Sequence, residues 1–331
     1  MKDHDKFQAL IVDREQGEVS YSFKKLSFQD LPAEDVLIRV HYSSLNYKDG
    51  LAVLNRGKIV RKYPMVPGID LAGTVEKSKN PAYHPGDKVI LTGWETGEKH
   101  WGGYAEYAAA KAEWLVPLPG GLGMKHAMSI GTAGLTAMLA VMSLEKHGVN
   151  HEKPILVTGA SGGVGSLAVA ILSRLGYQVV ASTGSQNAHS FLKDLGATEI
   201  IDRQELSENP RPLQSQRWGG AVDVVGGNTL SNVLSGISYY GTVASCGLAG
   251  DNKLNATVYP FILRGIKLVG IDSNTCPSDI RLKAWERLTE ILPADLLDQL
   301  TTVYGLKDVP ALSEKILRGD VQGRIVIEIG K

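Results

Sequence analysis

The stretch ILVTGASGGVGSLAVAILSRLG, from Ile155 to Gly176, decides the fold of this chain. It reads as a buried strand, a turn with four glycines, and a helix from Ser166 to Leu175 that ends at Gly176. Glycine permits a tight turn and a close backbone approach, and the first amides of a helix attract an anion. We therefore predict a phosphate-binding loop within a βαβ unit, with a glycine turn that binds no ligand as the alternative. The loop residues expected to bind the phosphates are Ala160, Ser161, Gly162, Gly163 and Val164.

Strand-like and helical segments alternate around this loop from about Ala127 onward. Such alternation is typical of an α/β fold in which helices cover both faces of a parallel sheet. We predict a doubly wound sheet. Its six expected strands are Pro154–Thr158, Gln178–Ser182, Glu199–Ile201, Ala221–Val225, Gly241–Ser245 and Lys267–Ile271.

The first third of the chain is rich in short strand-like runs that end at Gly, Pro, Asn or Asp. These runs are Phe7–Val12, Val36–Tyr42, Gly73–Val75 and Lys88–Leu91. Frequent Pro and Gly between brief extended segments indicate a partly closed barrel. After Ser273 we expect one helix, Asp279–Leu292, and one last strand, Gly323–Ile329, and we assign this tail to the first lobe.

Composition excludes several classes of protein. The 331 residues are enough for two domains, and 35 basic residues balance 35 acidic ones, so no net charge draws the chain to nucleic acid or to an anionic membrane. The N-terminus lacks a signal-like segment, and we see no stretch near the roughly 18 apolar residues of a membrane span. We expect a cytoplasmic protein. Its two cysteines, Cys246 and Cys276, lack the paired spacing of a zinc site and are expected to be buried.

The end of the second expected strand determines which dinucleotide fits. An acidic residue there would bind the ribose hydroxyls of NAD, whereas this chain has Ser182, Thr183 and Gly184, which favour the 2′-phosphate of NADP(H). Arg203, after the third strand, is the expected cationic partner, with a solvated surface arginine as the alternative. Leu248 and Ser273 lie in loops at the carboxyl ends of later strands, where a cofactor binds in such sheets, although both can be plain loop residues.

Six motifs occur in an order that resembles the medium-chain dehydrogenase/reductases: SSLNYKD, VPGIDLAGTV, GDKV, GGYAEY, GTAGLTA and GASGGVG. The chain looks most like the zinc-free quinone oxidoreductase branch, within its acryloyl-CoA reductase-like subgroup. The resemblance implies a GroES-like substrate domain, residues 1–125 and 276–331, and a Rossmann domain, residues 126–275. Zinc-dependent members have His-Glu where this chain has Ile69-Asp70, so a Cys/His zinc site cannot form. We expect Asp70 to be structural.

The resemblance also implies roles for individual residues. Tyr42 and Asn46 would position cofactor and substrate in a cleft between the lobes, with a core aromatic and a turn residue as the alternatives. Thr132 would lie near the nicotinamide carboxamide, and Asp320 would touch the cofactor. Some members carry an Arg where this chain has Ser185, which leaves Arg203 as the main cationic candidate.

These features predict an NADPH-dependent reductase that transfers hydride to an activated C=C bond, as in an enoyl-CoA or an enone. Such a substrate already has an electron-poor carbon and needs no Lewis acid. A quinone oxidoreductase is the closest alternative, and a nicotinamide-nucleotide-binding protein without turnover is another. A basic cluster fits CoA phosphates or a solvated face: Arg56, Lys58, Arg61 and Lys62. The apolar sixth strand is expected at a sheet edge, where it would form a homodimer.

Overall fold

A computed structural model describes residues 6–330, which form two compact units. Unit 1 holds the chain up to Thr132, then Asn274–Thr289 and the residues from Pro293. Unit 2 holds Ala133–Ser273 and Glu290–Leu292. The sequence placed the two boundaries after residues 125 and 275, whereas the chain changes unit after residues 132 and 273.

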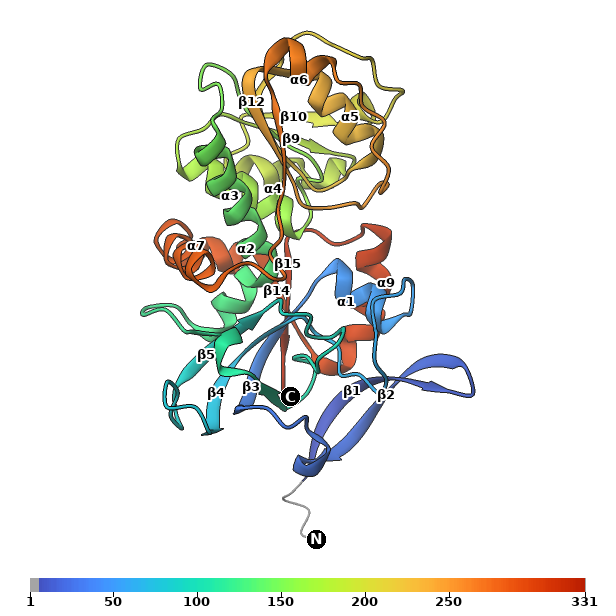
Figure 1. The fold of residues 1–331 in the computed structure, drawn as a ribbon, viewed down its shortest axis with the longest axis vertical. Coiled ribbons are helices and arrows are strands. Elements are labelled where there is room, and N and C mark those ends of the chain that lie inside the picture. Colours follow the sequence, from blue (N-terminus) through green and yellow to red (C-terminus); the bar gives the residue numbers. More distant parts are fainter. Residues whose placement is uncertain (1–5, 331) are drawn as a thin grey trace. The chain divides into compact units, whose positions relative to one another are not determined.

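Unit 2 contains the predicted six-stranded parallel sheet, of which β9, β10 and β12 are labelled in Figure 1. The strand order is β10-β9-β8-β11-β12-β13. All six expected strands are present. The strands on either side of the glycine loop and its helix, Ile155–Val157 and Val179–Thr183, are buried along their whole length, as strands covered on both faces are. The six strands are β8 (Ile155–Val157), β9 (Val179–Thr183), β10 (Glu199–Asp202), β11 (Trp218–Asp223), β12 (Ile237–Ser245) and β13 (Lys267–Gly270).

The helices of unit 2 pack their apolar sides on this sheet. Helix α3 begins at the end of the glycine loop, and residues 165–172 within it are all buried. Helix α5 contributes Leu230, Val233 and Leu234 to a core that also contains Ala221 and Val243 from the sheet. The helices of the unit that follow the loop are α3 (Gly163–Arg174), α4 (His189–Asp194), α5 (Gly227–Gly236) and α6 (Tyr259–Arg264).

Helix α2 (Met124–His147) corrects one expectation from the sequence. It is long and apolar enough to cross a membrane, with a mean hydropathy of 1.6 over an 18-residue window, although no such stretch was expected. However, 89% of that window is buried inside the protein, which is typical of a core helix. The helix is also interrupted at Gly131, whose φ of 51° and ψ of −158° are not helical.

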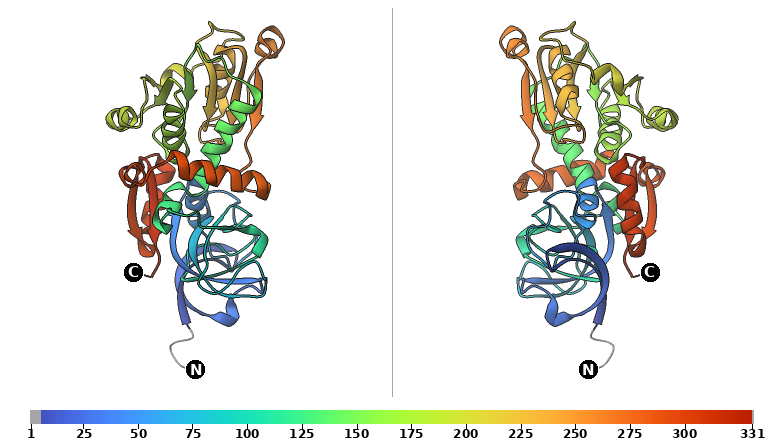
Figure 2. Two further views of the ribbon diagram at one scale, coloured as in Figure 1. Left: turned by 90° about the vertical axis from the view of Figure 1, so that its left-hand side faces the viewer. Right: turned by 90° about the vertical axis from the view of Figure 1, so that its right-hand side faces the viewer.

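Unit 1 is a strongly curved β-structure, and its strands form the partly open barrel seen from two sides in Figure 2. Its main sheet has the order β14-β15-β3-β4-β5-β7, with β6 paired to β3, while β1 and β2 form a separate hairpin. The strands are β1 (Lys6–Glu15), β2 (Glu18–Ser27), β3 (Val36–Leu45), β4 (Asp70–Ser78), β5 (Lys88–Thr92), β6 (Tyr107–Ala110), β7 (Leu115–Pro117), β14 (Thr301–Gly305) and β15 (Arg324–Glu328).

The C-terminal tail has more elements than the sequence predicted. The helix and the strand expected after Ser273 are both present, as Ser278–Ile291 and Arg324–Glu328, but the described residues between them form two more helices and one more strand that were not predicted. Strand β15 joins β3 in antiparallel fashion, and β14 adds to it in parallel. The remaining helices of unit 1 are α1 (Tyr47–Val53), α7 (Ser278–Ile291), α8 (Ala294–Leu300) and α9 (Val309–Arg318).

Candidate functional site

Asp70, the first residue of β4, is the centre of a buried polar network in unit 1. Its side chain is fully buried. Thr132 donates to it twice, from the backbone N–H at 3.0 Å and from the hydroxyl at 2.5 Å. The Ser44 hydroxyl donates at 2.5 Å and the Asn46 amide at 2.9 Å. One carboxylate therefore joins the end of β3 to the start of the helical segment that follows Gly131.

Asn46 precedes α1, and its side-chain amide is fully used within the network. The Nδ2 group lies within hydrogen-bonding distance of Asp70 and, at 3.1 Å, of Asp49. Its Oδ1 accepts from the Arg324 guanidinium at 3.2 Å. Asn46 was predicted to position cofactor and substrate, and the structure shows it oriented by two carboxylates and one cation.

Asp49 is the second buried carboxylate of the network. It accepts backbone N–H groups of Ile69 at 2.8 Å and of Asn46 at 2.9 Å. Burial and, as a second cause, the nearby Asp70 charge together raise the pKa of Asp49 to about 6. These backbone hydrogen bonds act in the opposite direction, because they favour the charged carboxylate.

Arg324, the first residue of β15, supplies the positive charge of the network. It is 2% exposed, and its Nε donates to the Ser129 carbonyl at 2.9 Å. Burial lowers the pKa of Arg324, while Asp70 and Asp49 oppose that shift. Within residues 6–330, its Nη2 has no hydrogen-bond partner. Sequence reasoning missed both Arg324 and Ser44. The signal available for Arg324 was its place at the start of an apolar strand, because a charged side chain that is buried requires a partner.

Tyr42 lies on β3 beside this network. It is half-buried and pairs with Glu328 of β15 and with Ala72 of β4. The β3–β4 register shifts between Val40 and Tyr42, and the three residues after Tyr42 are all buried. Such an irregularity re-aims side chains, and bulges are frequent beside functional sites.

The network does not suit a zinc ion. Zinc sites in proteins use mainly Cys and His ligands, whereas this position offers carboxylate, amide and hydroxyl groups that already hydrogen-bond to one another. No group of three or more His, Cys, Asp or Glu side chains that could hold a metal exists in the part of the chain that the structure describes.

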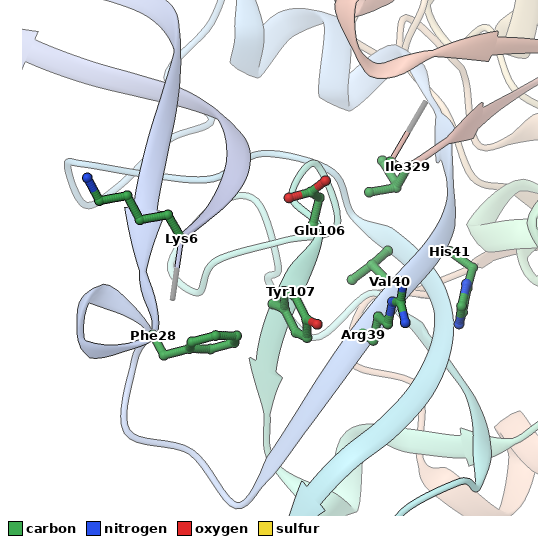
Figure 3. A pocket seen from close by; sticks show the side chains of 9 residues that line it. Lys6, Phe28, Arg39, Val40, His41, Glu106, Tyr107 and Ile329 are labelled. Carbon is green, nitrogen blue, oxygen red and sulfur yellow. The ribbon is translucent and has the colours of Figure 1, made fainter. Parts of the chain in front are cut away.

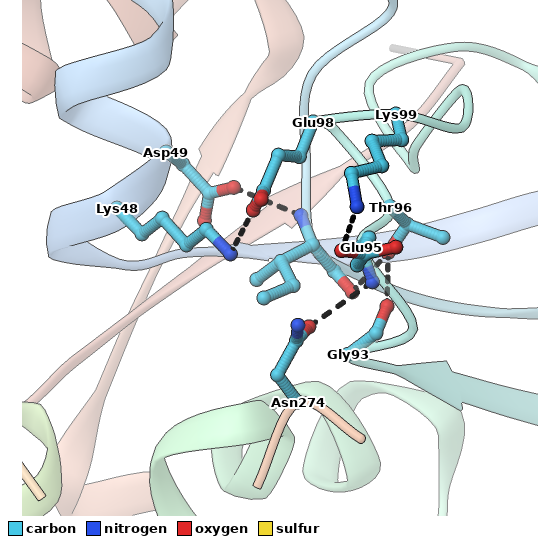
Figure 4. A network of polar contacts seen from close by, with 9 residues as sticks. Lys48, Asp49, Gly93, Glu95, Thr96, Glu98, Lys99 and Asn274 are labelled. Carbon is cyan, nitrogen blue, oxygen red and sulfur yellow. Dashed lines mark hydrogen bonds and ion pairs between the residues drawn. The ribbon is translucent and has the colours of Figure 1, made fainter. Parts of the chain in front are cut away.

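A loop after β5 is tied to Asp49 of the same network through Ile69, whose N–H donates to Asp49 and whose carbonyl accepts from Thr96 of the loop. Figure 4 shows Asp49 together with Gly93, Glu95 and Thr96 of this loop. The Thr96 hydroxyl lies 2.9 Å from the Ile69 carbonyl and 2.7 Å from that of Gly93. Trp94 and Glu95 have left-handed φ angles of 56° and 59°, which are strained for residues with a side chain. Asn274 holds this turn, because its carbonyl and its Oδ1 accept from the two backbone N–H groups at 2.8 and 3.0 Å.

The glycine loop of unit 2 has the close packing that its sequence predicted. A Cβ on Gly165 would lie 2.3 Å from the Gly159 carbonyl oxygen, so a side chain at position 165 would collide with the backbone. The loop is held to the end of β9 by a backbone bond from Ala160 to Ser182 and by the 3.1 Å contact between the Ser161 and Thr183 hydroxyls. The first N–H groups of α3 lack intrahelical acceptors, as at any helix start, and can bind phosphate.

Arg203 lies at the end of β9, as the topology predicted. It follows β10, which pairs with β9 through Asp202 and Thr183. A Cβ on Gly184 would lie 2.4 Å from Arg203 Nε, so the guanidinium rests directly on this glycine. The structure thus brings together Ser182, Thr183, Gly184 and Arg203.

The other predicted cofactor residues have the following surroundings. Leu248 is 65% exposed in the loop after β12. Ser273 receives a hydrogen bond of 2.6 Å from the Thr136 hydroxyl within unit 2. Asp320 is exposed in unit 1 and pairs with Arg318 at 2.8 Å. The structure does not bring Asp320 into the Asp70 network.

A surface hollow of about 310 Å³ lies elsewhere in unit 1 (Figure 3). It contains none of the predicted site residues. Burial lowers the pKa of His41 on its wall, and the His41 ring contacts the Thr74 hydroxyl at 3.0 Å. The hollow is lined by Lys6, Phe28, Arg39, Val40, His41, Glu106, Tyr107, Ile329 and Gly330.

Comparisons with known proteins agree with this architecture. The family model of the alcohol dehydrogenase GroES-like domain matches residues 32–120, and that of the zinc-binding dehydrogenases matches residues 163–290. The chain is 53% identical to the acrylyl-CoA reductase AcuI of Ruegeria pomeroyi, covering 98% of this chain and 99% of that protein. It is 48% identical to a Bacillus subtilis protein named quinone oxidoreductase YhfP, over 98% and 99% of the two chains.

Solved structures of similar proteins contain dinucleotides. The yhdH oxidoreductase from Salmonella enterica, in complex with NADP, superposes with a TM-score of 0.95 at 50% identity, covering 97% of this chain and 99% of that one. Bacillus subtilis yhfP with NAD bound gives 0.93 at 46% identity, covering 98% and 99%. This chain therefore belongs to the medium-chain dehydrogenase/reductases, in the group that contains acrylyl-CoA reductases and quinone oxidoreductases.

Proposed function

We propose that this protein is a zinc-independent, NADPH-dependent reductase that transfers hydride to the C=C bond of an enoyl thioester such as acryloyl-CoA. The observation that carries this proposal is the 53% identity to an acrylyl-CoA reductase along nearly the whole chain. The Asp70 network adds physical support, because its carboxylate, amide and hydroxyl groups do not suit zinc, and hydride transfer to an already electron-poor alkene needs no Lewis acid.

NADP(H) is the proposed cofactor. The glycine loop, with residues 160–164, would hold the pyrophosphate, and Arg203 with Ser182, Thr183 and Gly184 would bind the 2′-phosphate. Leu248, Ser273 and Asp320 remain proposed contacts from the sequence. The cofactor supplies the hydride, and the protein supplies binding and orientation.

Tyr42 is the proposed donor to the substrate carbonyl. Among the described residues its hydroxyl makes no hydrogen bond, so it is free to donate to the oxygen on which negative charge develops during hydride transfer. Asn46 was the other candidate donor, but both N–H groups of its amide face carboxylates. We therefore assign Asn46 a positioning role and keep Thr132 as the proposed contact to the carboxamide.

A homodimer is the proposed assembly in a cytoplasmic setting. Strand β13 is the edge of the described parallel sheet, and an edge strand presents unpaired backbone groups. Exposed apolar side chains lie on α6, just before this strand in the chain, including Ile262 at 69% and Leu263 at 54% exposure. Sedimentation velocity that gives a monomer at micromolar concentration would contradict this assembly.

Quinone reduction is the second candidate, favoured by the 48% identity to a protein named as a quinone oxidoreductase. The decisive experiment is steady-state oxidation of NADPH, and of NADH at equal concentration, with acryloyl-CoA and 1,4-benzoquinone offered separately. We expect saturable turnover of the thioester with NADPH. Turnover of the quinone alone would establish the second candidate, and turnover of neither would support a nucleotide-binding protein without activity.

A further inference from the structure

The Asp70 carboxylate is saturated with hydrogen bonds from residues that are far apart in the sequence. A carboxylate has about four acceptor positions, and four groups donate to Asp70: the Thr132 backbone N–H, the Thr132 hydroxyl, the Ser44 hydroxyl and the Asn46 amide. Because the side chain is fully buried, no water competes for these positions. Asp70 therefore determines how each of these groups is oriented.

This saturation sets the direction of hydrogen bonding at Thr132. A threonine hydroxyl has one proton, and here that proton is directed to Asp70 at 2.5 Å. Toward any other partner the Thr132 oxygen can only accept. An amide such as that of nicotinamide would consequently have to present its N–H to Thr132, and this selects one of the two flipped orientations of the carboxamide.

The same carboxylate fixes Asn46. Its amide nitrogen is directed to Asp70 and Asp49, and its carbonyl oxygen faces Arg324, so the amide has a single favourable orientation. Asn46 begins helix α1 directly after the strand that carries Tyr42. A change at Asp70 would therefore affect both Thr132, the proposed cofactor contact, and the segment that carries Tyr42, the proposed hydrogen-bond donor to the substrate carbonyl.

We propose that Asp70 is a positioning residue for hydride transfer, which holds the Thr132 hydroxyl as an obligate acceptor for the cofactor carboxamide and locks Asn46 in place. This inference rests on the proposed function in one respect, since it takes Thr132 as a cofactor contact. Asp70 itself touches neither substrate nor cofactor, and its effect passes through Thr132 and Asn46.

The test uses single-turnover stopped flow with NADPH carrying deuterium on one face of C4, and with whichever of acryloyl-CoA and 1,4-benzoquinone the wild type reduces. Asp70→Asn keeps the size but turns an acceptor into a donor. We expect hydride transfer, identified by its deuterium isotope effect, to slow about 100-fold, the cost typical of a misplacement near 1 Å, with the NADPH dissociation constant nearly unchanged. Ser313→Ala, which removes another buried hydrogen bond of unit 1, should change none of these.

A second pair of variants tests the link without altering the buried charge. Thr132→Val should slow hydride transfer, and Thr132→Ser should restore its rate. In the Thr132→Val background, Asp70→Asn should slow the reaction by a smaller factor than in the wild type, because the two residues act through one contact.

The positioning role would be overturned if Asp70→Asn slowed the reaction by the same factor with Thr132 and with Val at position 132, or if Thr132→Val transferred hydride at the wild-type rate. If the wild type reduces only the quinone, the proposed thioester activity is wrong. The same variants then test the positioning role with quinone as the acceptor. Reduction of neither acceptor contradicts both proposals.

Discussion

The guanidinium of Arg203 lies against the Cα of Gly184. A Cβ at position 184 would come within 2.4 Å of Arg203 Nε and 2.7 Å of its Cδ, so any larger residue there would displace the arginine. The two residues follow adjacent parallel strands, at the strand end where the adenosine ribose binds in doubly wound folds. Gly184 thus makes room for a cation at the position that separates NADP from NAD.

Arg203→Ala should raise the KM for NADPH by about 10- to 100-fold, since a hydrogen bond to a charged group contributes about 1.5–3 kcal/mol and about 1.4 kcal/mol corresponds to a factor of ten. The KM for NADH should stay the same, because NADH has no 2′-phosphate. Steady-state kinetics with each dinucleotide measures both values.

The matched control for Arg203 is Arg211→Ala, which removes an exposed arginine elsewhere in unit 2 and should leave both KM values unchanged. Gly184→Ala should act in the same direction as Arg203→Ala, because its methyl group occupies the place of the guanidinium. If Arg203→Ala raised the KM for both dinucleotides by a similar factor, Arg203 would not be the residue that binds the 2′-phosphate.

The sequence predicted the parallel sheet better than the C-terminal tail, for a physical reason. Strands buried on both faces are continuous apolar runs, as in β8 and β9, and these are visible locally. Helix α8 has only seven residues, and β14 has no buried residue in its five, so neither shows a clear period of 3.6 or 2. Strand β14 pairs with β15, and a pairing between two separate segments cannot be read from a local sequence pattern.

The candidate site was predicted only in its parts. Asn46 and Thr132 were identified through family resemblance and Asp70 was judged structural, while the structure joins all three in one network. The missing information was long-range, since Arg324 reaches Asn46 across 278 positions of the chain. Local patterns do not specify such pairs. A buried charge without a local partner is the one sequence signal that points to them.

Gly131→Ala should destabilise the protein strongly. Gly131 has a φ of 51°, and a Cβ there would lie 2.6 Å from Asp70 Oδ2 and 3.1 Å from Arg324 Nη2. The backbone strain alone costs about 1–3 kcal/mol, and displacement of the two charged groups adds to it. The free energy of unfolding in urea measures the total.

Gly121→Ala is the control that separates these two causes. Gly121 also has a positive φ, of 82°, but a Cβ there would meet no atom within 4 Å. We expect Gly121→Ala to show the backbone cost alone and Gly131→Ala to show a larger loss. Equal losses in the two variants would mean that the network yields to the extra methyl group without cost.

Asp49 should make the protein less stable as the pH rises, which is the reverse of the usual effect of a carboxylate. Its pKa is raised to about 6 in the folded protein, mainly by burial and then by Asp70, against about 3.9 in an unfolded chain. Between about pH 4 and pH 6 the folded state therefore binds more protons, so this group lowers the free energy of unfolding as pH rises, and its effect levels off above pH 6. The full change is of the order of 3 kcal/mol, because each pKa unit corresponds to about 1.4 kcal/mol.

The measurement is urea unfolding of the wild type and of Asp49→Asn from about pH 4 to pH 7. The quantity of interest is the difference in free energy of unfolding between the wild type and Asp49→Asn. Other titrating groups contribute equally to both proteins and cancel in this difference. The loss of the Asp49 acceptor adds a constant that does not vary with pH. The stability of the wild type relative to Asp49→Asn should fall as the pH rises through this window. A difference that stays constant from pH 4 to pH 7 would show that Asp49 is ionised throughout, and that Arg324 and the surrounding N–H groups outweigh its burial.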